Sequence, residues 1–321
     1  MNESDRRFGP PEWAMSTVIA VIWGSSFLWI AIAIDHVDVT VVPLARCLFG
    51  VGALGLFAPA RVRVDRRDQR RFAFLGLCWM AIPFLLYPIA EQTVSTSITG
   101  MLNGGLPIVT AVVTAVFTRV VPSAFRIAAV AVGGTGIVLI SLASIGDDDG
   151  GGANAAADGK GIMLLLIALV CYAIAANVAR PMQAKYGALA TMLWITGYGV
   201  VWSLPLGLNG IRHSDFTWTA IGALVALGAV GTGVAFAFYG VLLHRAGPVR
   251  GMIGIFFTPI VGTILGIAFR DDELHGAAIA GMGIVILGAM MTSRPEPAAA
   301  SPSAVRSRPG TRLRIFGRSA D

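Results

Sequence analysis

Charged residues are scarce in this chain. Aspartate, glutamate, lysine and arginine make up 13% of its 321 residues, about half of the roughly 25% that soluble domains carry. So few charges cannot cover a water-exposed surface, and they gather in short clusters between long apolar stretches. A chain that is 55% hydrophobic with a mean hydropathy of +0.74 is therefore not an ordinary soluble domain, and its composition indicates an integral membrane protein.

The sequence also lacks the residue clusters that hold metals or catalyse reactions. Cys47, Cys78 and Cys171 fall inside predicted helices, and an odd number without ligand spacing predicts small core residues, not a disulfide framework or a metal site. The four histidines are scattered over loops and helix ends: His36, His213, His244 and His275. No phosphate-binding GxxxxGK[ST] pattern occurs, which argues against an ATP-driven pump within this chain. We expect no catalytic residue, no metal and no cofactor, and hence no enzyme.

Long apolar runs are what the chain has in abundance. Each is about 18–24 residues long, and a helix of that length, rising 1.5 Å per residue, spans a hydrocarbon core of about 30 Å. Backbone polar groups in lipid must be satisfied within the segment, so the runs are predicted to be helices. The predicted helices are 13–34, 40–60, 72–90, 95–118, 124–144, 161–179, 188–208, 217–241, 250–269 and 274–292. The predicted fold is all-α: a polytopic membrane protein with ten transmembrane helices in two inverted five-helix repeats.

The distribution of positive charge predicts the orientation. If the N-terminus is cytoplasmic, 20 of the 24 lysines and arginines lie on the inner side, three (Lys160, Arg212 and Arg270) lie outside, and Arg46 lies within a helix. This asymmetry follows the positive-inside rule and places both termini in the cytoplasm, with the protein in the plasma membrane. The basic surplus then faces anionic lipid, so we expect membrane lipid and no nucleic acid as a partner.

Five predicted helices precede a polar stretch near the middle of the chain, and five follow it. With an odd number in each half, the halves have opposite membrane orientations. The predicted division is a cytoplasmic N-terminus (1–12), a first repeat (13–144), a flexible extracytoplasmic linker (145–160), a second repeat (161–292) and a disordered basic cytoplasmic tail (293–321).

Traces of a duplication support the two halves. Tyr87 precedes Pro107 by 20 residues, and Tyr239 precedes Pro259 by the same 20. Both prolines begin the sequence Pro-Ile-Val. Inverted repeats allow two related conformations that open to opposite sides, with a binding site between the halves near the bilayer midplane.

Four stretches carry a family resemblance. They are Trp23-Gly24-Ser25-Ser26-Phe27, Pro43 with Arg46, Ala90 to Pro107, and Pro259 to Asp272. Together they resemble the EamA-type transporters of the drug/metabolite transporter superfamily, over about residues 13–292. The resemblance implies a ten-helix export carrier with both termini in the cytoplasm.

The chain departs from that family pattern at two places. The acidic residue that follows the fourth helix in the family is absent, and Arg119 and Val120 stand there instead. After the ninth helix, Asp272 occupies the approximate place of the usual glutamate. We interpret this carboxylate as an interfacial helix cap or salt-bridge partner.

Two charged residues near membrane depth are candidates for the solute site. An arginine at the centre of a helix costs roughly 2.5–3.5 kcal/mol on insertion scales. Arg46 should therefore contact an anion, pair with an acid as a gate residue, or snorkel outward. Glu91 could bind a cation, carry a coupled proton or pair with Arg46, and the alternative is an ordinary interfacial carboxylate.

Small polar residues extend the candidate site. Ser25 and Ser26, beside Trp23, are predicted to hydrogen-bond either across helices or to a ligand, although such residues are commonly packing contacts. Asn103 lies in mid-helix, where a buried amide needs partners. It either lines a cavity or forms a bond between helices.

Aromatic residues are the remaining cavity candidates. Tyr87 and Tyr239 are related by the repeat, and the alternative is a place in the aromatic belt at the interface. Trp194, Tyr198 and Trp202 recur every four residues on one helix face. That stripe suits an aromatic cavity for a cationic or apolar solute, or else helix packing and lipid contact.

Four prolines within predicted helices suggest motion of those helices. Pro83, Pro88, Pro107 and Pro259 interrupt helix hydrogen bonding and are predicted hinge points. The leading hypothesis is a secondary carrier that exports a small metabolite, amino acid or drug-like compound by alternating access. The alternatives are a membrane enzyme acting on lipid and a non-transporting membrane subunit. The oligomeric state stays open.

Overall fold

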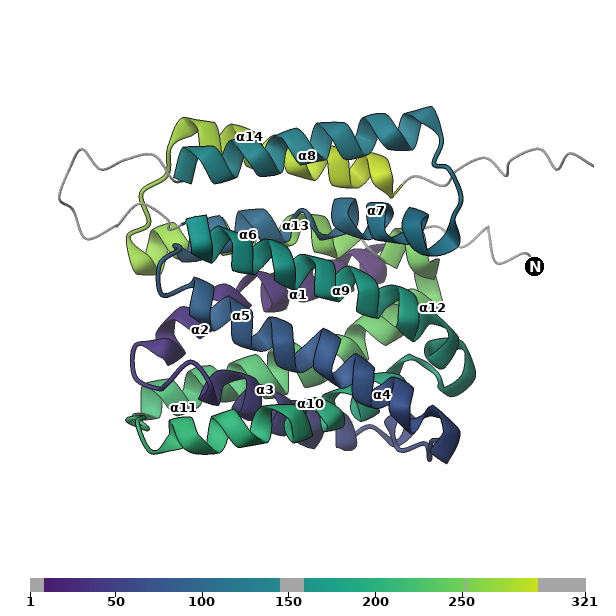
Figure 1. The fold of residues 1–321 in the computed structure, drawn as a ribbon, viewed down its shortest axis with the longest axis vertical. Helices are drawn as coiled ribbons and strands as arrows, with labels where there is room; N and C mark the ends of the chain where they lie inside the picture. Colours follow the sequence, from purple (N-terminus) through teal and green to yellow (C-terminus); the bar gives the residue numbers. More distant parts are fainter. Residues whose placement is uncertain (1–8, 145–158, 252, 294–321) are drawn as a thin grey trace, which may run out of the picture.

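The structure is a computed structural model that describes residues 9–144, 159–251 and 253–293. Within these ranges the chain is helical and contains no strand, which confirms the prediction of an all-α fold for that part of it. The helices are α1 (Pro10–Gly24), α2 (Ser26–Ile34), α3 (Val41–Gly55), α4 (Gln69–Leu75), α5 (Ile82–Ala90), α6 (Thr96–Asn103), α7 (Leu106–Thr118), α8 (Ala124–Ser144), α9 (Gly159–Tyr186), α10 (Ala188–Ile211), α11 (Trp218–Val225), α12 (Ala235–Gly251), α13 (Ile253–Arg270) and α14 (Gly276–Thr292) (Figure 1). The predicted N-terminal segment, linker and tail lie mostly outside the described residues.

Seven helical stretches are long and apolar enough to cross a membrane. They are Pro10–Ile34, Arg66–Ala90, Thr96–Thr118, Ala124–Ser144, Gly159–Tyr186, Ala188–Ile211 and Trp218–Leu242. Three shorter apolar helices coincide with the remaining predicted spans: Val41–Gly55, Gly254–Arg270 and Gly276–Thr292. The chain is thus a multi-pass membrane protein.

Three predicted helix ends differ from the structure by five residues or more. The helix predicted to reach residue 60 ends at Gly55, and a separate 3-10 turn, Ala58–Ala60, follows it. The one predicted to end at residue 179 continues through Pro181 to Tyr186. The one predicted to end at residue 241 continues to Gly251, so most of the loop predicted before the next helix is helical.

Several spans are interrupted at defined residues. The first breaks at Ser25, between α1 and α2. The third and eighth predicted helices each contain a π-helical segment, Gly76–Ala81 and Ala226–Val234, a rare feature found frequently at functional sites. Of the predicted hinge prolines, Pro83 follows the first π segment and Pro107 begins α7 just after a break, whereas the other two lie inside α5 and α13.

Three helix pairs, each joining one half of the chain to the other, pack closely and run antiparallel. Along each pair, residue numbers rise on one helix as they fall on the other. The close approaches are Gly133 with Gly288 and Gly136 with Val285 (α8–α14), Gly100 with Gly262 and Gly104 with Pro259 (α6–α13), and Cys47 with Gly199 and Leu44 with Gly207 (α3–α10). Because glycine has no side chain beyond a hydrogen atom, these helices can approach closely, as is common between membrane helices.

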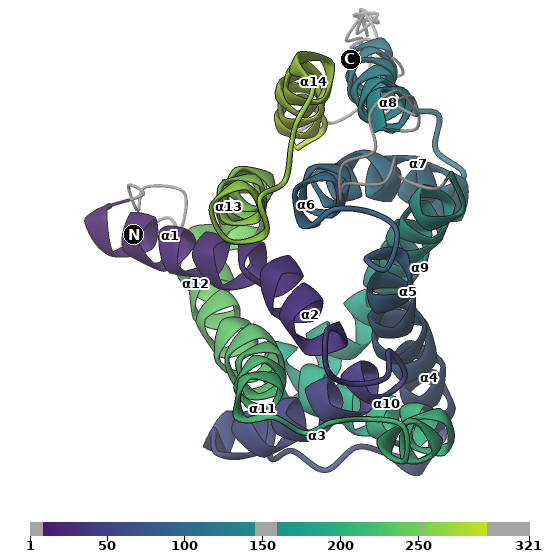
Figure 2. The same ribbon diagram turned by 90° about the vertical axis from the view of Figure 1, so that its left-hand side faces the viewer.

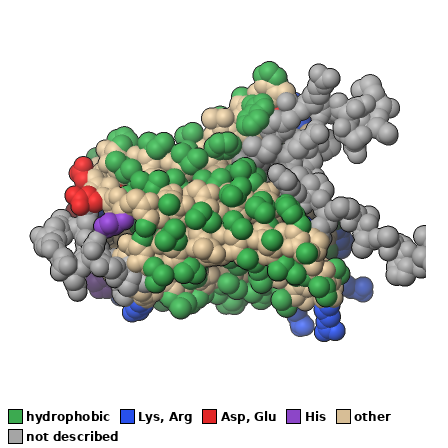
Figure 3. All heavy atoms as spheres, turned by 90° about the horizontal axis from the view of Figure 1, so that it is seen from above, with side chains coloured by type: hydrophobic (Ala, Val, Ile, Leu, Met, Phe, Trp, Pro, Cys, Tyr) green, Lys and Arg blue, Asp and Glu red, His purple; other side chains and the backbone are tan. Residues whose placement is uncertain are grey.

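The remaining helices are arranged around the middle of the molecule. Viewed along the helices, α1 and α2 lie opposite α5 and α9, while α8 and α14 lie side by side at one edge (Figure 2). In Figure 3, hydrophobic side chains cover the long face between the two ends, acidic side chains gather at one end, and most of the visible lysines and arginines lie at the other.

Candidate functional site

Arg46 lies on α3 with its side chain directed into the helix bundle. The residue is half-buried, its Nε donates to Thr232 Oγ1 at 3.3 Å, and its Cζ lies 4.0 Å from the centre of the Phe84 ring. Among the described residues, no acid lies within 4.0 Å of this guanidinium. The positive charge is therefore stabilised by an aromatic face and a hydroxyl, and the predicted pairing with Glu91 is not formed.

Trp23 on α1 contacts the eighth span. Its Nε1 donates to the Gly231 carbonyl at 3.1 Å, and its ring lies 5.3 Å from Tyr239 and 5.8 Å from Phe236 between centroids. A tryptophan of the first half and a tyrosine of the second, both predicted site residues, are thus brought together.

The two predicted serines contact their own helix. Ser25 Oγ and Ser26 Oγ donate to the Ile22 carbonyl at 3.0 and 3.3 Å. These bonds satisfy the carbonyl next to the break between α1 and α2. Ser26, which is buried, also faces Gly231 of the second half.

Tyr87 joins three spans. Its hydroxyl donates to Asn103 Oδ1 at 2.6 Å, which is the interhelical bond predicted as one alternative for that amide. Its ring lies 5.9 Å from Phe27 on α2 and 6.1 Å from Tyr172 on α9. We call the residues that these contacts connect the central group: Trp23, Ser26, Phe27, Arg46, Phe84, Tyr87, Asn103, Tyr172, Gly231, Thr232, Phe236 and Tyr239.

Glu91 caps the C-terminus of α5, one turn beyond Tyr87. Both of its carboxylate oxygens are shielded from solvent, and neither has a hydrogen-bond partner among the described residues. The charges that act on it are those of Asp272, Arg270 and Arg46. A carboxyl group in such a setting is best accommodated with a proton bound or in contact with a cation. Binding of a cation or a proton by Glu91 stays a prediction.

Asp272 caps the helix that begins the fourth span, as the sequence interpretation proposed. Its Oδ2 accepts from the backbone N–H of Ser97 in the first turn of α6 at 2.7 Å. Nearby, Arg270 at the end of α13 forms a two-bond ion pair with Asp35, at 2.6 and 3.2 Å, at the end of α2.

Replacing Asp272 by alanine is expected to destabilise the protein by about 1–2 kcal/mol, because the Ser97 amide loses its acceptor. Asp272→Asn keeps an acceptor oxygen and should cost less. Thermal unfolding of the purified protein in detergent measures both. Equal melting temperatures for Asp272→Ala and the wild type would contradict a stabilising cap at Asp272.

The aromatic stripe of α10 faces the segment that leads into the third span. Its three polar atoms donate to acceptors there: Trp194 Nε1 to Val62 O at 2.9 Å, Tyr198 Oη to Gln69 Oε1 at 2.6 Å, and Trp202 Nε1 to Ala73 O at 2.8 Å. None of the three contacts the central group through a hydrogen bond or a ring contact among the described residues. Their arrangement is that of a packing surface, and solute binding by Trp194 and Tyr198 stays a prediction.

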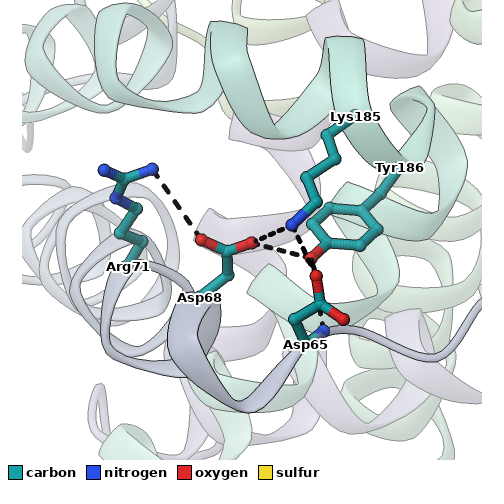
Figure 4. A network of polar contacts seen from close by, with 5 residues as sticks. All are labelled: Asp65, Asp68, Arg71, Lys185 and Tyr186. Atoms are coloured by element: carbon teal, nitrogen blue, oxygen red, sulfur yellow. Dashed lines mark hydrogen bonds and ion pairs between the residues drawn. The ribbon is translucent and has the colours of Figure 1, made fainter.

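A polar network ties the segment before α4 to the end of α9 (Figure 4). Lys185 Nζ donates to Asp65 at 2.6 Å and to Asp68 at 2.8 Å, and the Tyr186 hydroxyl donates to both carboxylates. Arg71 lies 3.8 Å from Asp68. Hydrogen bonds from Lys185 and Tyr186 hold the pKa of Asp65 below its usual value.

This network makes part of the stability pH-dependent. A carboxyl whose pKa is lowered by folding contributes stability above its unfolded pKa of about 3.9 and loses it as the pH falls through the lower folded value. Thermal unfolding followed from neutral pH to about pH 3 should therefore show a steeper loss for the wild type than for Asp65→Asn. Because Asp65 is exposed, the difference should be small. Parallel pH profiles would contradict the assignment.

Sequence reasoning missed six members of the central group: Phe27, Phe84, Tyr172, Gly231, Thr232 and Phe236. They are apolar or weakly polar residues in apolar spans, where sequence alone does not tell inward-facing positions from lipid-facing ones. The available signal was their spacing from known candidates. Phe84 precedes Tyr87 by three residues and Phe236 precedes Tyr239 by three, which places each pair on one helix face.

Comparisons with known proteins agree with the fold. A model of the EamA-like transporter family matches residues 13–142 and 159–294. A probable terminal-alkyne amino-acid exporter of Streptantibioticus cattleyicolor is 25% identical over 286 residues, which are 88% of this chain and 93% of that protein. An uncharacterized transporter of Archaeoglobus fulgidus is 19% identical over 283 residues, 88% of this chain and 99% of that protein.

The fold also occurs in a solved crystal structure. It superposes with a TM-score of 0.58 at 16% sequence identity and covers 88% of this chain and 96% of its own, a likeness that concerns the fold alone. The family model, by contrast, matches twice and accounts for most of the sequence. The chain therefore belongs to the EamA-like transporter family.

Proposed function

We propose that this protein is a secondary transporter that exports a small solute across the plasma membrane by alternating access. The observation that carries the proposal is Arg46, a cation within an apolar bundle that contacts Phe84 of the first half and Thr232 of the second. A charge held between the two halves without an acidic partner suits a site that a solute occupies.

Helix pairing supports an inverted repeat of two five-helix halves, 13–144 and 161–292. The antiparallel pairs α3–α10, α6–α13 and α8–α14 each join spans of the same rank in the two halves. Contacts of α1, the first helix of the first half, have counterparts for α9, the first helix of the second half. α1 packs on α13 and α12 of the second half, and α9 packs on the corresponding helices of the first half, α7 and α5.

Backbone conformation supports the same repeat. The non-glycine residues with positive φ among those described are Arg119 (54°) and Asp271 (53°), which follow the fourth and ninth spans. They are 152 residues apart, as are Tyr87 and Tyr239. The two π segments also occupy matching spans.

The proposed arrangement has ten crossings, with both termini in the cytoplasm. The three shorter helices, of 15 to 18 residues, reach about 22–27 Å, and tilt or local thinning of the bilayer accommodates such a mismatch. Acidic residues at the end that holds Asp35 and Asp272, opposite the basic cluster near Arg66, agree with the positive-inside assignment.

Glu91 is the group we propose for proton coupling. A buried carboxyl without hydrogen-bond partners can exchange a proton as the surrounding helices move. The name of the Streptantibioticus relative supports an amino-acid-sized solute. The hinge prolines Pro83, Pro88, Pro107 and Pro259 would accommodate bending during the cycle.

Reconstitution tests this function directly. The purified protein in liposomes should give saturable uptake of at least one solute from a panel of amino acids, nucleosides and organic cations, above that of protein-free liposomes. Saturable flux that is abolished by an excess of unlabelled solute would support a carrier. Uptake no greater than in protein-free vesicles for the whole panel would favour a non-transporting membrane subunit.

A further inference from the structure

The guanidinium of Arg46 has unused hydrogen-bonding capacity. It carries five N–H donors, and among the described residues Thr232 Oγ1 is the one acceptor that it contacts. The Phe84 ring stabilises the charge but accepts no directed hydrogen bond from the outer nitrogens. The side chain is thus held by Thr232 and Phe84, and its remaining N–H donors have no acceptor among the described residues.

A small space beside that guanidinium exists because residue 231 is glycine. A Cβ built on Gly231 would lie 3.4 Å from both the Ala226 carbonyl oxygen and Ser26 Oγ, and 4.0 Å from Arg46 Nη2, with no other atom nearer than 4 Å outside the adjacent helix backbone. The space therefore admits about one methyl-sized atom without a clash. Its walls include a hydroxyl from the first span and a cation from the second.

The position of Gly231 is itself well defined. It lies in the π segment Ala226–Val234, and its carbonyl accepts from Trp23 Nε1 at 3.1 Å. This bond fixes the backbone of the eighth span against the first span. A π turn at this point and a glycine facing two donors are features that helix packing alone does not require.

We propose that Arg46, Ser26 and Gly231 form the subsite for the carboxylate end of the transported solute. A planar guanidinium matches a carboxylate with two parallel N–H donors. The Ser26 hydroxyl, by turning away from the Ile22 carbonyl to which it donates at 3.3 Å, can donate to an oxygen in the space beside Gly231. A single cation and room for one small atom suit a monovalent carboxylate rather than a phosphate, which carries more charge and a third oxygen. The rings of Trp23, Phe27 and Phe84 would contact an apolar body. The proposal rests on the proposed transport function and specifies its solute class.

Matched sets of small molecules test which charged end is recognised. Phenylalanine carries a carboxylate and an ammonium, 3-phenylpropanoate only the carboxylate, and phenethylamine only the ammonium. Each is measured by the shift in thermal unfolding of the detergent-purified protein and by flux into liposomes. We expect the two carboxylates to bind and to compete with one another, and phenethylamine to do neither.

Gly231→Ala is the decisive variant, because alanine fits sterically yet fills the space. Carboxylate affinity should fall by about tenfold or more, as expected for loss of a hydrogen bond to a charged group. Gly222→Ala, in the same span with no atom within 4 Å of the added Cβ, is the control and should bind normally. Arg46→Lys keeps the charge but not the planar fork and should bind more weakly than the wild type.

The outcomes separate this subsite from the transport function. Flux of phenethylamine without flux or binding of either carboxylate overturns the subsite and leaves a transporter. Carboxylate binding that Gly231→Ala weakens, without flux of any probe, supports the subsite and contradicts transport. Unchanged carboxylate binding by both Gly231→Ala and Arg46→Lys overturns the subsite, and leaves Arg46 as a packing residue on Phe84.

Discussion

Glu91→Gln is expected to reduce proton-driven flux by about tenfold or more while leaving the protein folded. In the wild type, an inward proton gradient should accelerate solute efflux from liposomes, because a proton bound at Glu91 returns as the solute leaves. Glutamine has nearly the same shape but cannot release a proton, so the variant should lose its response to the gradient. Solute efflux at several imposed pH gradients measures the effect.

Stability should not follow the loss of flux. The carboxylate oxygens of Glu91 have no hydrogen-bond partner among the described residues, so the neutral amide removes a charge that folding does not stabilise. The groups that act on Glu91, namely Asp272, Arg270 and Arg46, remain in place. Glu273→Gln, at an exposed acid next to Asp272, is the control and should behave as the wild type. Wild-type flux with an unchanged pH profile in Glu91→Gln would exclude it as the coupling group.

The apolar spans could be predicted from the sequence because lipid imposes a length and a composition on each of them. The same rule does not predict where a helix breaks inside a span. Next to the interruption at Ser25, Gly24 packs closely against Val261, where an added Cβ would lie 2.5 Å from the valine side chain. Contacts of this kind join residues more than 200 positions apart and leave no local pattern.

In the candidate site too, some residues could be predicted from the sequence, whereas their neighbours depend on tertiary packing. Arg46, Glu91 and Asn103 could be named as candidates because a polar group in an apolar span is costly unless it has a partner or a function. The stripe of α10 has equally conspicuous residues, yet Trp194 and Trp202 direct their indole N–H groups to backbone carbonyls of the neighbouring segment. Helical spacing places residues on one face, but which neighbour that face meets is decided by tertiary packing. Gly231 could not be identified at all, because its role depends on an absent side chain.

Gly288→Ala is expected to destabilise the protein by about 3 kcal/mol, the upper end of typical overpacking costs. A Cβ at this position would overlap the Cα of Gly133 and lie 2.5 Å from the Gly133 nitrogen. These are backbone atoms, so no rotamer change relieves the clash, and α8 and α14 must move apart along their length. Unfolding in a detergent titration, or the melting temperature, measures the loss.

The same helices provide a matched control for that prediction. Gly283 on α14 and Gly134 on α8 have no atom within 4 Å of an added Cβ, so Gly283→Ala and Gly134→Ala should be neutral or slightly stabilising through helix propensity. The substitution is chemically identical at all three sites, and only the neighbour differs. Equal stabilities for Gly288→Ala and Gly283→Ala would mean that α8 and α14 do not pack through Gly133 and Gly288. The antiparallel pairing of α8 and α14, and with it one support for the proposed inverted repeat, would then be lost.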